Sequence, residues 1–291
     1  MSTSVRAAAV AGLFYPRDPR ELARLVDRLL DDAAAARPGG QGPEGSRVEG
    51  EDEPVKGVIA PHAGYAYSGP VAASAYLRLR PERGTVSRVV LLGPTHRAYV
   101  RGLALPGADA FETPLGRVPV DADAIARIAS LPQVVTSPGA HAQEHSLEVH
   151  LPFLQRLFGP DFTLLPLAVG EATPDEVAEV LERVWGGPET KIVISSDLSH
   201  FLGYRDAYRV DRATADRIVH LEPVVGEQAC GARPVNGLLA LARRRDLSLE
   251  LVDLRSSGDT AGGRDEVVGY GAFLVHEPAA SARESERGGV A

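Results

Sequence analysis

The sequence predicts an α/β fold in a single domain, with a central mixed β-sheet flanked by helices on both faces. Two observations indicate this class. Apolar segments alternate with helical segments along most of the chain, and the apolar segments are continuous rather than alternately polar and apolar. A strand that is apolar on both sides must be covered on both faces, which is typical of a sheet between two layers of helices.

The first expected element is an amphipathic helix at residues 18–30. Asp18 is of a type favoured at a helix start, Pro19 suits the first turn, and leucine and valine then recur on one face. Segment 37–54 is rich in Gly, Pro and acidic residues without periodicity, which indicates a mobile surface loop. Segment 277–291 is polar and rich in small residues, so we expect a disordered tail after a single domain at residues 1–276.

Between these segments, strands and helices are expected to alternate, because apolar runs of strand length are separated by longer segments with helical periodicity. The expected strands lie at residues 55–60, 88–92, 162–169, 191–195, 249–254 and 267–275, with short strands between 103 and 120. The expected helices lie at residues 70–79, 122–129, 144–158, 174–184, about 208–220 and 234–243.

Composition and charge exclude several classes of function. The chain has 291 residues, of which 44% are hydrophobic and 24% charged, as in an ordinary soluble globular protein. The net charge of −8 argues against nucleic acid as a partner, since phosphate-binding surfaces carry a basic excess. Every apolar run falls short of the roughly 18 to 20 residues that span a bilayer, and the amino terminus lacks signal-peptide features. We therefore expect a cytoplasmic protein without membrane association.

Three histidines follow predicted strands at equivalent positions. His62 follows Val-Ile-Ala-Pro, His96 follows Leu-Leu-Gly-Pro-Thr, and His200 follows Ile-Val-Ile-Ser-Ser-Asp-Leu-Ser. Loops at the carboxyl ends of strands form the ligand crevice of an open α/β sheet, so these imidazoles are expected to converge. A single such histidine is more often satisfied by a neighbouring carbonyl, but three in the same topological place favour a site.

Cys230 is the single cysteine of the chain and cannot form an intramolecular disulfide, which is typical of the reducing cytoplasm. It lies just ahead of a predicted helix, where backbone N–H groups favour a thiolate. The alternative is a small buried hydrophobic residue, and the two interpretations are about equally supported. Two neutral imidazoles with one anionic ligand leave open positions on a redox metal such as Fe(II), so Cys230 is a candidate third ligand.

Asp197 and His200 are three residues apart in one short loop, where a carboxylate can orient an imidazole. His200 is therefore a candidate acid or base, although Asp197 could equally cap the turn or the next helix. A hydrolase with Ser196 or Ser199 as nucleophile is a weaker alternative, because residues so close in sequence seldom form a triad.

The run Glu144-His145-Ser-Leu-Glu148-Val-His150 also resembles a ligand set. If the segment is helical, the spacing places His145 and Glu148 on one face, as in some carboxylate metal sites. The run lacks the His-Glu-x-x-His pattern of thermolysin-like peptidases. Capping and packing explain Glu148 and His150, whereas His145 is the better active-site candidate. The remaining histidines are interpreted as structural or surface residues: His141, His220 and His276.

Six motifs in the order of the chain resemble those of the Memo family, whose prokaryotic members are labelled AmmeMemoRadiSam system protein B. The resemblance extends from about Val5 to Val275. The motifs are Ala9-Val-Ala-Gly-Leu-Phe-Tyr-Pro, Ala60-Pro-His-Ala-Gly-Tyr-Ala-Tyr-Ser-Gly, Leu92-Gly-Pro-Thr-His, Glu144-His-Ser-Leu-Glu-Val-His-Leu-Pro-Phe, Ser195-Ser-Asp-Leu-Ser-His and Cys230-Gly.

The Memo family is in turn similar to class III extradiol ring-cleaving dioxygenases, which hold a non-haem Fe(II) with two histidines and a glutamate. The resemblance implies an extradiol-dioxygenase-like fold. It implies that His62 and His96 are metal ligands and that Cys230 takes the place of the glutamate. It also implies catalytic roles for His200 and Asp197. Aromatic pocket walls are implied at Phe14 and Tyr67, and we place His145 in the same substrate pocket.

The resemblance implies a transition metal as cofactor, with Fe(II) or copper favoured and zinc as an alternative. It implies a metal-dependent oxidoreductase that acts on an unknown small molecule or peptide. The alternative is a non-catalytic metal-binding or partner-binding protein with a vestigial dioxygenase site. The family label further implies a functional link to AMMECR-type and radical-SAM proteins.

Overall fold

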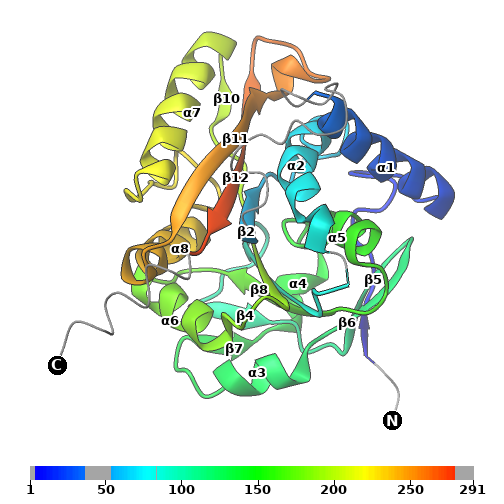
Figure 1. The fold of residues 1–291 in the computed structure, drawn as a ribbon, viewed down its shortest axis with the longest axis vertical. Helices are drawn as coiled ribbons and strands as arrows, with labels where there is room; N and C mark the ends of the chain where they lie inside the picture. Colours follow the sequence, from blue (N-terminus) through cyan, green and yellow to red (C-terminus); the bar gives the residue numbers. More distant parts are fainter. Residues whose placement is uncertain (1–3, 37–53, 83, 279–291) are drawn as a thin grey trace.

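The computed structural model describes residues 4–36, 54–82 and 84–278. Figure 1 shows an α/β fold in which one large mixed sheet lies between helices, and this confirms the predicted fold class. The loop predicted at 37–54 and the tail predicted at 277–291 fall almost entirely outside the described residues. Among the described helices, none is both long and apolar enough to cross a membrane.

The large sheet has nine strands in the part of the chain that the structure describes. Its middle is parallel, in the order β2, β9, β3 and β8, and antiparallel strands extend it on both sides, with β12 beside β2 and β4 beside β8. The strands are β2 (Val55–Ala60), β3 (Arg88–Pro94), β4 (Leu103–Leu105), β7 (Val134–Thr136), β8 (Thr163–Val169), β9 (Thr190–Ser195), β10 (His200–Leu202), β11 (Ser248–Ser256) and β12 (Val267–His276).

Two hydrophobic cores lie on the two faces of this sheet. Successive residues of β3 alternate between them, with Val89 and Leu91 in one core and Val90 and Leu92 in the other. The first core is covered by α1 (Pro19–Ala35), α2 (Gly69–Tyr76) and α5 (Leu151–Phe158). The second is covered by α3 (Ala122–Ile128), α6 (Pro174–Val184), α7 (Tyr204–Val219) and α8 (Ala232–Arg245). The continuous apolar strands are thus explained by burial on both sides.

A small second sheet ties the amino terminus to the domain. It consists of β1 (Val5–Arg6), β5 (Ala110–Thr113) and β6 (Gly116–Pro119), with β1 parallel to β5. The chain after β1 is held by the buried carboxylate of Glu148. This carboxylate accepts hydrogen bonds from the backbone amides of Ala9 and Val10, at 2.8 and 3.0 Å, and also contacts Arg6 and the Tyr15 hydroxyl.

The prediction of a helix at residues 144–158 is wrong for its first half, residues 144–150. The Glu144 carboxylate accepts hydrogen bonds from the backbone amides of the next two residues, which form a turn. A short 3₁₀ helix follows at Glu148–His150, and α5 begins only at Leu151. His145 and Glu148 therefore do not share a helix face. The Glu148 carboxylate contacts the amino-terminal segment instead.

The other predicted elements are present within a few residues of their expected bounds. The strand at 55–60 and the helix at 174–184 are confirmed residue for residue as β2 and α6. The elements that the sequence pattern did not indicate are all short, namely β1, β7, β10, α4 (Pro138–Ala142) and a 3₁₀ helix at Ser257–Asp259. Such segments have too few residues to show a periodicity.

Candidate metal site

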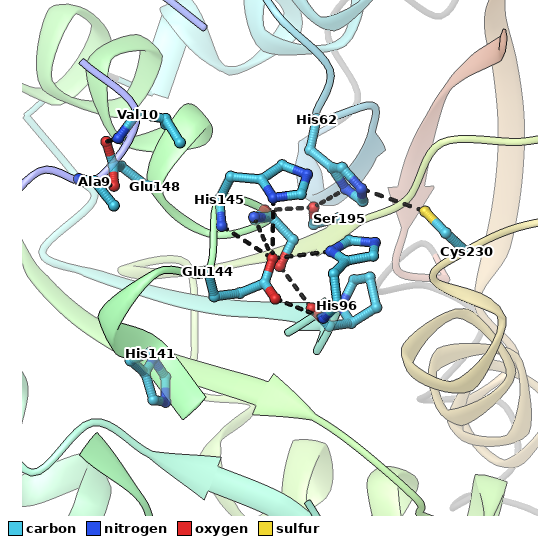
Figure 2. Close-up of polar contacts among 12 residues, drawn as sticks. Ala9, Val10, His62, His96, His141, Glu144, His145, Glu148, Ser195 and Cys230 are labelled. Carbon is cyan, nitrogen blue, oxygen red and sulfur yellow. Dashed lines mark hydrogen bonds and ion pairs between the residues drawn. The ribbon is translucent and has the colours of Figure 1, made fainter. Parts of the chain in front are cut away.

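Three histidines converge at the carboxyl edge of the sheet. His62 follows β2, His96 follows β3, and His145 lies in the turn before α5 (Figure 2). Each offers one ring nitrogen, and the three nitrogens lie within 4.8 Å of one another. His62 is buried, His145 is partly exposed and His96 is exposed. The expected convergence of His62 and His96 is thus observed, His145 joins them, and His200 is outside this group of three.

The parallel pairing of neighbouring strands produces this convergence. Ala60 pairs with Ser195 across β2 and β9, and Leu92 of β3 pairs with Ile194 of β9, so the three strands end at the same edge. Gly93 then allows the turn after Glu144 to approach β3. A Cβ atom at this glycine would lie 2.8 Å from the Ser146 Oγ, closer than side chains tolerate.

Ser195 determines which ring nitrogen of His62 carries the hydrogen. The Ser195 hydroxyl donates to the Ser146 carbonyl at 2.6 Å, so its hydrogen is already used. Its oxygen, which lies 2.6 Å from His62 Nδ1, must therefore accept from an Nδ1–H group. His62 Nε2 is left with its lone pair. Burial lowers the pKa of His62 well below its usual range, which favours the neutral ring that a metal requires.

Glu144 lies behind the other two imidazoles. Its Oε1 is 2.9 Å from His96 Nδ1 and 3.4 Å from His145 Nδ1. Although burial would raise the pKa of Glu144, hydrogen bonds from the His96 side chain and backbone lower it to about 2. Burial lowers the pKa of His145 to about 4, against the opposing effect of Glu144. An ionised carboxylate therefore faces a neutral His145 ring at neutral pH.

The sequence analysis did not identify Glu144 and Ser195 as site residues. Glu144 directly precedes His145, and Ser195 opens the motif that ends at His200. Both lie inside conspicuous motifs. Their partners are 48 and 133 residues away in the chain, so their contacts depend on the assembled sheet rather than on local spacing.

Cys230 lies next to His62. Its Sγ is 3.3 Å from His62 Nε2 and 3.7 Å from the Asp197 carbonyl oxygen (Figure 2). With metal–sulfur and metal–nitrogen bonds of about 2.3 and 2.0 Å, two ligands of one tetrahedral ion end roughly 3.5 Å apart. This pair of donors therefore fits a common metal ion. Burial raises the pKa of the thiol far above its usual range, so deprotonation would accompany metal binding. Cys230 as a ligand stays a prediction.

The predicted orientation of His200 by Asp197 does not match the contacts of either residue. Asp197 Oδ1 accepts from the backbone amide of His62 at 2.7 Å, and no hydrogen bond between Asp197 and His200 is present among the described residues. Asp197 lies in the short loop between β9 and β10, and its carboxylate contacts the residue that follows β2 by two positions. Burial raises the pKa of Asp197 to about 7 and lowers that of His200. The Ser196 hydroxyl donates to the Asp197 carbonyl at 2.8 Å, which gives no support to a serine nucleophile.

Phe14 lies beside the cluster. The Phe14 ring centroid is 4.8 Å from that of His145, and the Phe14 carbonyl accepts from the Tyr65 amide at 2.8 Å. Tyr67 belongs to the turn that follows His62, and 43% of its surface is exposed. Their roles as pocket walls stay predictions. His141 lies away from the cluster, where its Nε2 contacts the Ala104 carbonyl at 2.8 Å.

The chain is similar to proteins of one family over almost its whole length. The model of the Memo-like protein family matches residues 6–274. A MEMO1 family protein of Ignicoccus hospitalis is 36% identical, over 94% of this chain and 99% of the relative. The corresponding protein of Methanopyrus kandleri is 35% identical, over 92% and 98%. That of Aquifex aeolicus is 34% identical, over 91% and 97%.

Proposed function

The chain belongs to the Memo-like protein family, and we propose that its histidine cluster binds a transition metal ion used for redox chemistry on a small molecule. The observation that carries the proposal is the convergence of ring nitrogens from His62, His96 and His145 within 4.8 Å. Imidazoles suit iron, copper and zinc, and a thiolate adds softness that favours copper(I) or zinc. Fe(II) and copper are the metals we propose for a redox role, with zinc as the alternative.

We propose His62 and His96 as two of the ligands and Cys230 as the third, with His145 as the competitor for that position. The support for Cys230 is its distance of 3.3 Å from His62 Nε2. The support for His145 is its place in the cluster and a neutral ring at neutral pH. Both candidates fit a metal, so the third ligand is a question for experiment.

The chain's own groups supply proton transfer and exclusion of water. A bound Fe(II) or copper ion would provide open coordination positions for O₂ or a substrate. Asp197, with a pKa of about 7, can hold a proton close to His62 and Cys230 at neutral pH. We propose His200 as the group that exchanges protons with the substrate, and Phe14 and Tyr67 as walls that limit the access of water.

Metal titration of the purified protein tests the proposal. The protein is prepared without oxygen, stripped with a chelator and titrated with Co(II), Fe(II) or Cu(I). We expect one tightly bound ion per chain and an affinity lowered at least about 100-fold in His62→Ala. His220→Ala is the matched control, because His220 lies at the exposed end of α7. Absence of stoichiometric binding, or equal binding by His62→Ala, contradicts the proposal.

The third ligand is identified by comparing Cys230→Ala with His145→Ala. A thiolate bound to Co(II) gives an intense near-ultraviolet charge-transfer band, which imidazoles do not give. If Cys230 is the ligand, this band disappears in Cys230→Ala and is kept in His145→Ala. If His145 is the ligand, the wild-type spectrum lacks the band, and the affinity for Co(II) falls in His145→Ala but not in Cys230→Ala.

Metal binding without turnover is a second candidate function. It is favoured by Cys230, because a soft thiolate where the dioxygenases have a glutamate suits storage of copper(I) or zinc. Oxygen consumption by the metal-loaded protein discriminates the two functions. Consumption that depends on the metal and falls in His200→Ala supports the redox function, whereas an inert metal-loaded protein supports storage or partner binding.

A further inference from the structure

Glu144 makes an unusually dense set of contacts inside the site. The residue is 2% exposed, and its Oε2 accepts from the His96 backbone amide at 2.6 Å. Its Oε1 lies 2.9 Å from each of three donors, which are His96 Nδ1 and the backbone amides of His145 and Ser146. His145 Nδ1 is 3.4 Å from the same oxygen. One carboxylate thus contacts both the backbone and the rings of two cluster histidines.

We propose that Glu144 is a positioning residue that holds His96 and His145 as one unit, with both Nδ1 atoms turned to its Oε1 and both Nε2 atoms turned to the metal. This inference rests on the proposed metal-binding function. The two rings are stacked, with centroids 4.7 Å apart and planes inclined by 19°. Two nearly parallel rings whose Nδ1 atoms meet one oxygen have their Nε2 atoms on the same far side.

The chemistry of a carboxylate fixes the tautomer of the rings as well as their direction. An ionised carboxylate only accepts hydrogen bonds, so a ring nitrogen turned to it carries the hydrogen. A neutral imidazole has a single N–H group, and its Nε2 then keeps the lone pair that a metal needs. The shorter contact, at 2.9 Å, makes His96 the more firmly held of the two. His62 has the same tautomer, with hydrogen on Nδ1, because of Ser195. Glu144 would thus give all three cluster histidines a free Nε2 lone pair.

A purely structural role for Glu144 is the alternative, since it also binds three backbone amides. Glu148 provides a matched control for that role. It too is buried and accepts from backbone amides, at Ala9 and Val10, and its other contacts go to Arg6 and Tyr15 rather than to the rings of the cluster. Replacement of either glutamate by glutamine puts an NH₂ group among donors and weakens a buried network. Only the change at Glu144 removes a carboxylate that directly contacts the His96 and His145 rings.

The experiment compares wild type, Glu144→Gln and Glu148→Gln in two measurements. Long-range ¹H–¹⁵N spectra of the metal-free protein report the tautomer of each histidine, and Co(II) titration reports affinity and ligand geometry. We expect Nδ1–H tautomers for His96 and His145 in wild type and Glu148→Gln. Glu144→Gln should lose them, bind Co(II) about 10- to 100-fold more weakly and show a changed visible spectrum. Wild-type tautomers and affinity in folded Glu144→Gln would overturn the proposal.

Glu144→Asp keeps a carboxylate and provides a second test, also where Glu144→Gln is too unstable to purify. Recovery of Nδ1–H tautomers and of part of the Co(II) affinity supports the positioning role. An Nε2–H tautomer at His96 in the metal-free wild type overturns it without any variant. If wild type binds no Co(II) but keeps tautomers that depend on Glu144, the metal-binding function fails and the positioning role stands.

Discussion

At the scale of single residues, Ser195 controls His62 through one hydroxyl group that donates to Ser146 and accepts from His62. We expect Ser195→Ala to weaken metal binding about 10- to 100-fold, because His62 loses the acceptor that fixes its tautomer. Thr190→Ala is the control, since Thr190 is a buried hydroxyl residue at the other end of β9 that donates to Glu189 at 2.7 Å. Calorimetric titration of both variants checks the prediction. A loss of equal size in Thr190→Ala would point to general destabilisation instead.

The predictability of the site also differs from residue to residue. His62 and His96 could be placed from sequence, because each follows a continuous apolar strand and parallel strands end at one edge. The contact of Asp197 could not be placed, because a carboxylate beside a turn has several amides within reach. The role of Glu144 depends on the close approach of the turn after it to Gly93 in β3. This approach joins segments far apart in the chain, so a local sequence pattern does not predict it.

At the scale of elements, the turn before α8 depends on the absence of a side chain at Gly231. A Cβ atom there would lie 2.4 Å from the Ser195 carbonyl oxygen and 2.6 Å from the Ser196 Cβ. We expect Gly231→Ala to lower the free energy of unfolding by about 1 to 3 kcal/mol, since neither neighbour can move freely. Gly226→Ala in the same connection meets nothing within 4 Å and should change stability by less than about 0.5 kcal/mol. Urea denaturation measures both, and equal stabilities would contradict the steric argument.

The amino end of β2 carries a buried cation whose titration should be visible in stability. Lys56 donates to the carbonyl oxygens of Gly187 and Thr190 at 2.8 and 2.9 Å, and burial lowers its pKa from 10.5 to about 8. Between these values the unfolded chain binds more protons than the folded protein, so this lysine makes stability rise with pH. We expect the stability of wild type relative to Lys56→Met to increase by up to about 3 kcal/mol between pH 7.5 and 10.5. A difference that stays constant with pH would contradict a lowered pKa.

Element prediction succeeded where burial alone decides the local structure. The segment of β2 is a continuous apolar run, and that of α6 is an amphipathic pattern with a capping box. Each forms the expected element. Segment 144–150 has an equally helical pattern but forms a turn and a 3₁₀ helix. There Glu144 contacts His96 and Glu148 accepts from the amides of Ala9 and Val10, so tertiary contacts override the local preference.

At the scale of the whole molecule, the candidate ligands come from four separate places: after β2, after β3, before α5 and before α8. A metal bound to them can therefore bind the folded chain only. At a free metal concentration of about 100 times the Kd, we expect about 2.7 kcal/mol of added stability and a rise in Tm of roughly 5 to 10 °C. Differential scanning calorimetry with and without a chelator measures this rise. A similar rise in His62→Ala would show that the metal acts elsewhere.

The anchoring of the amino-terminal segment by Glu148 has a consequence for biosynthesis. Arg6 and Glu148 are 142 residues apart. At a synthesis rate of roughly 5 to 20 residues per second, the segment is made about 7 to 28 s before its anchor exists. Phe14 belongs to this segment and packs against His145, which is also made late. Phe14, the proposed pocket wall, is thus among the first residues translated, and its contact with His145 can form only after about half of the chain has been synthesised.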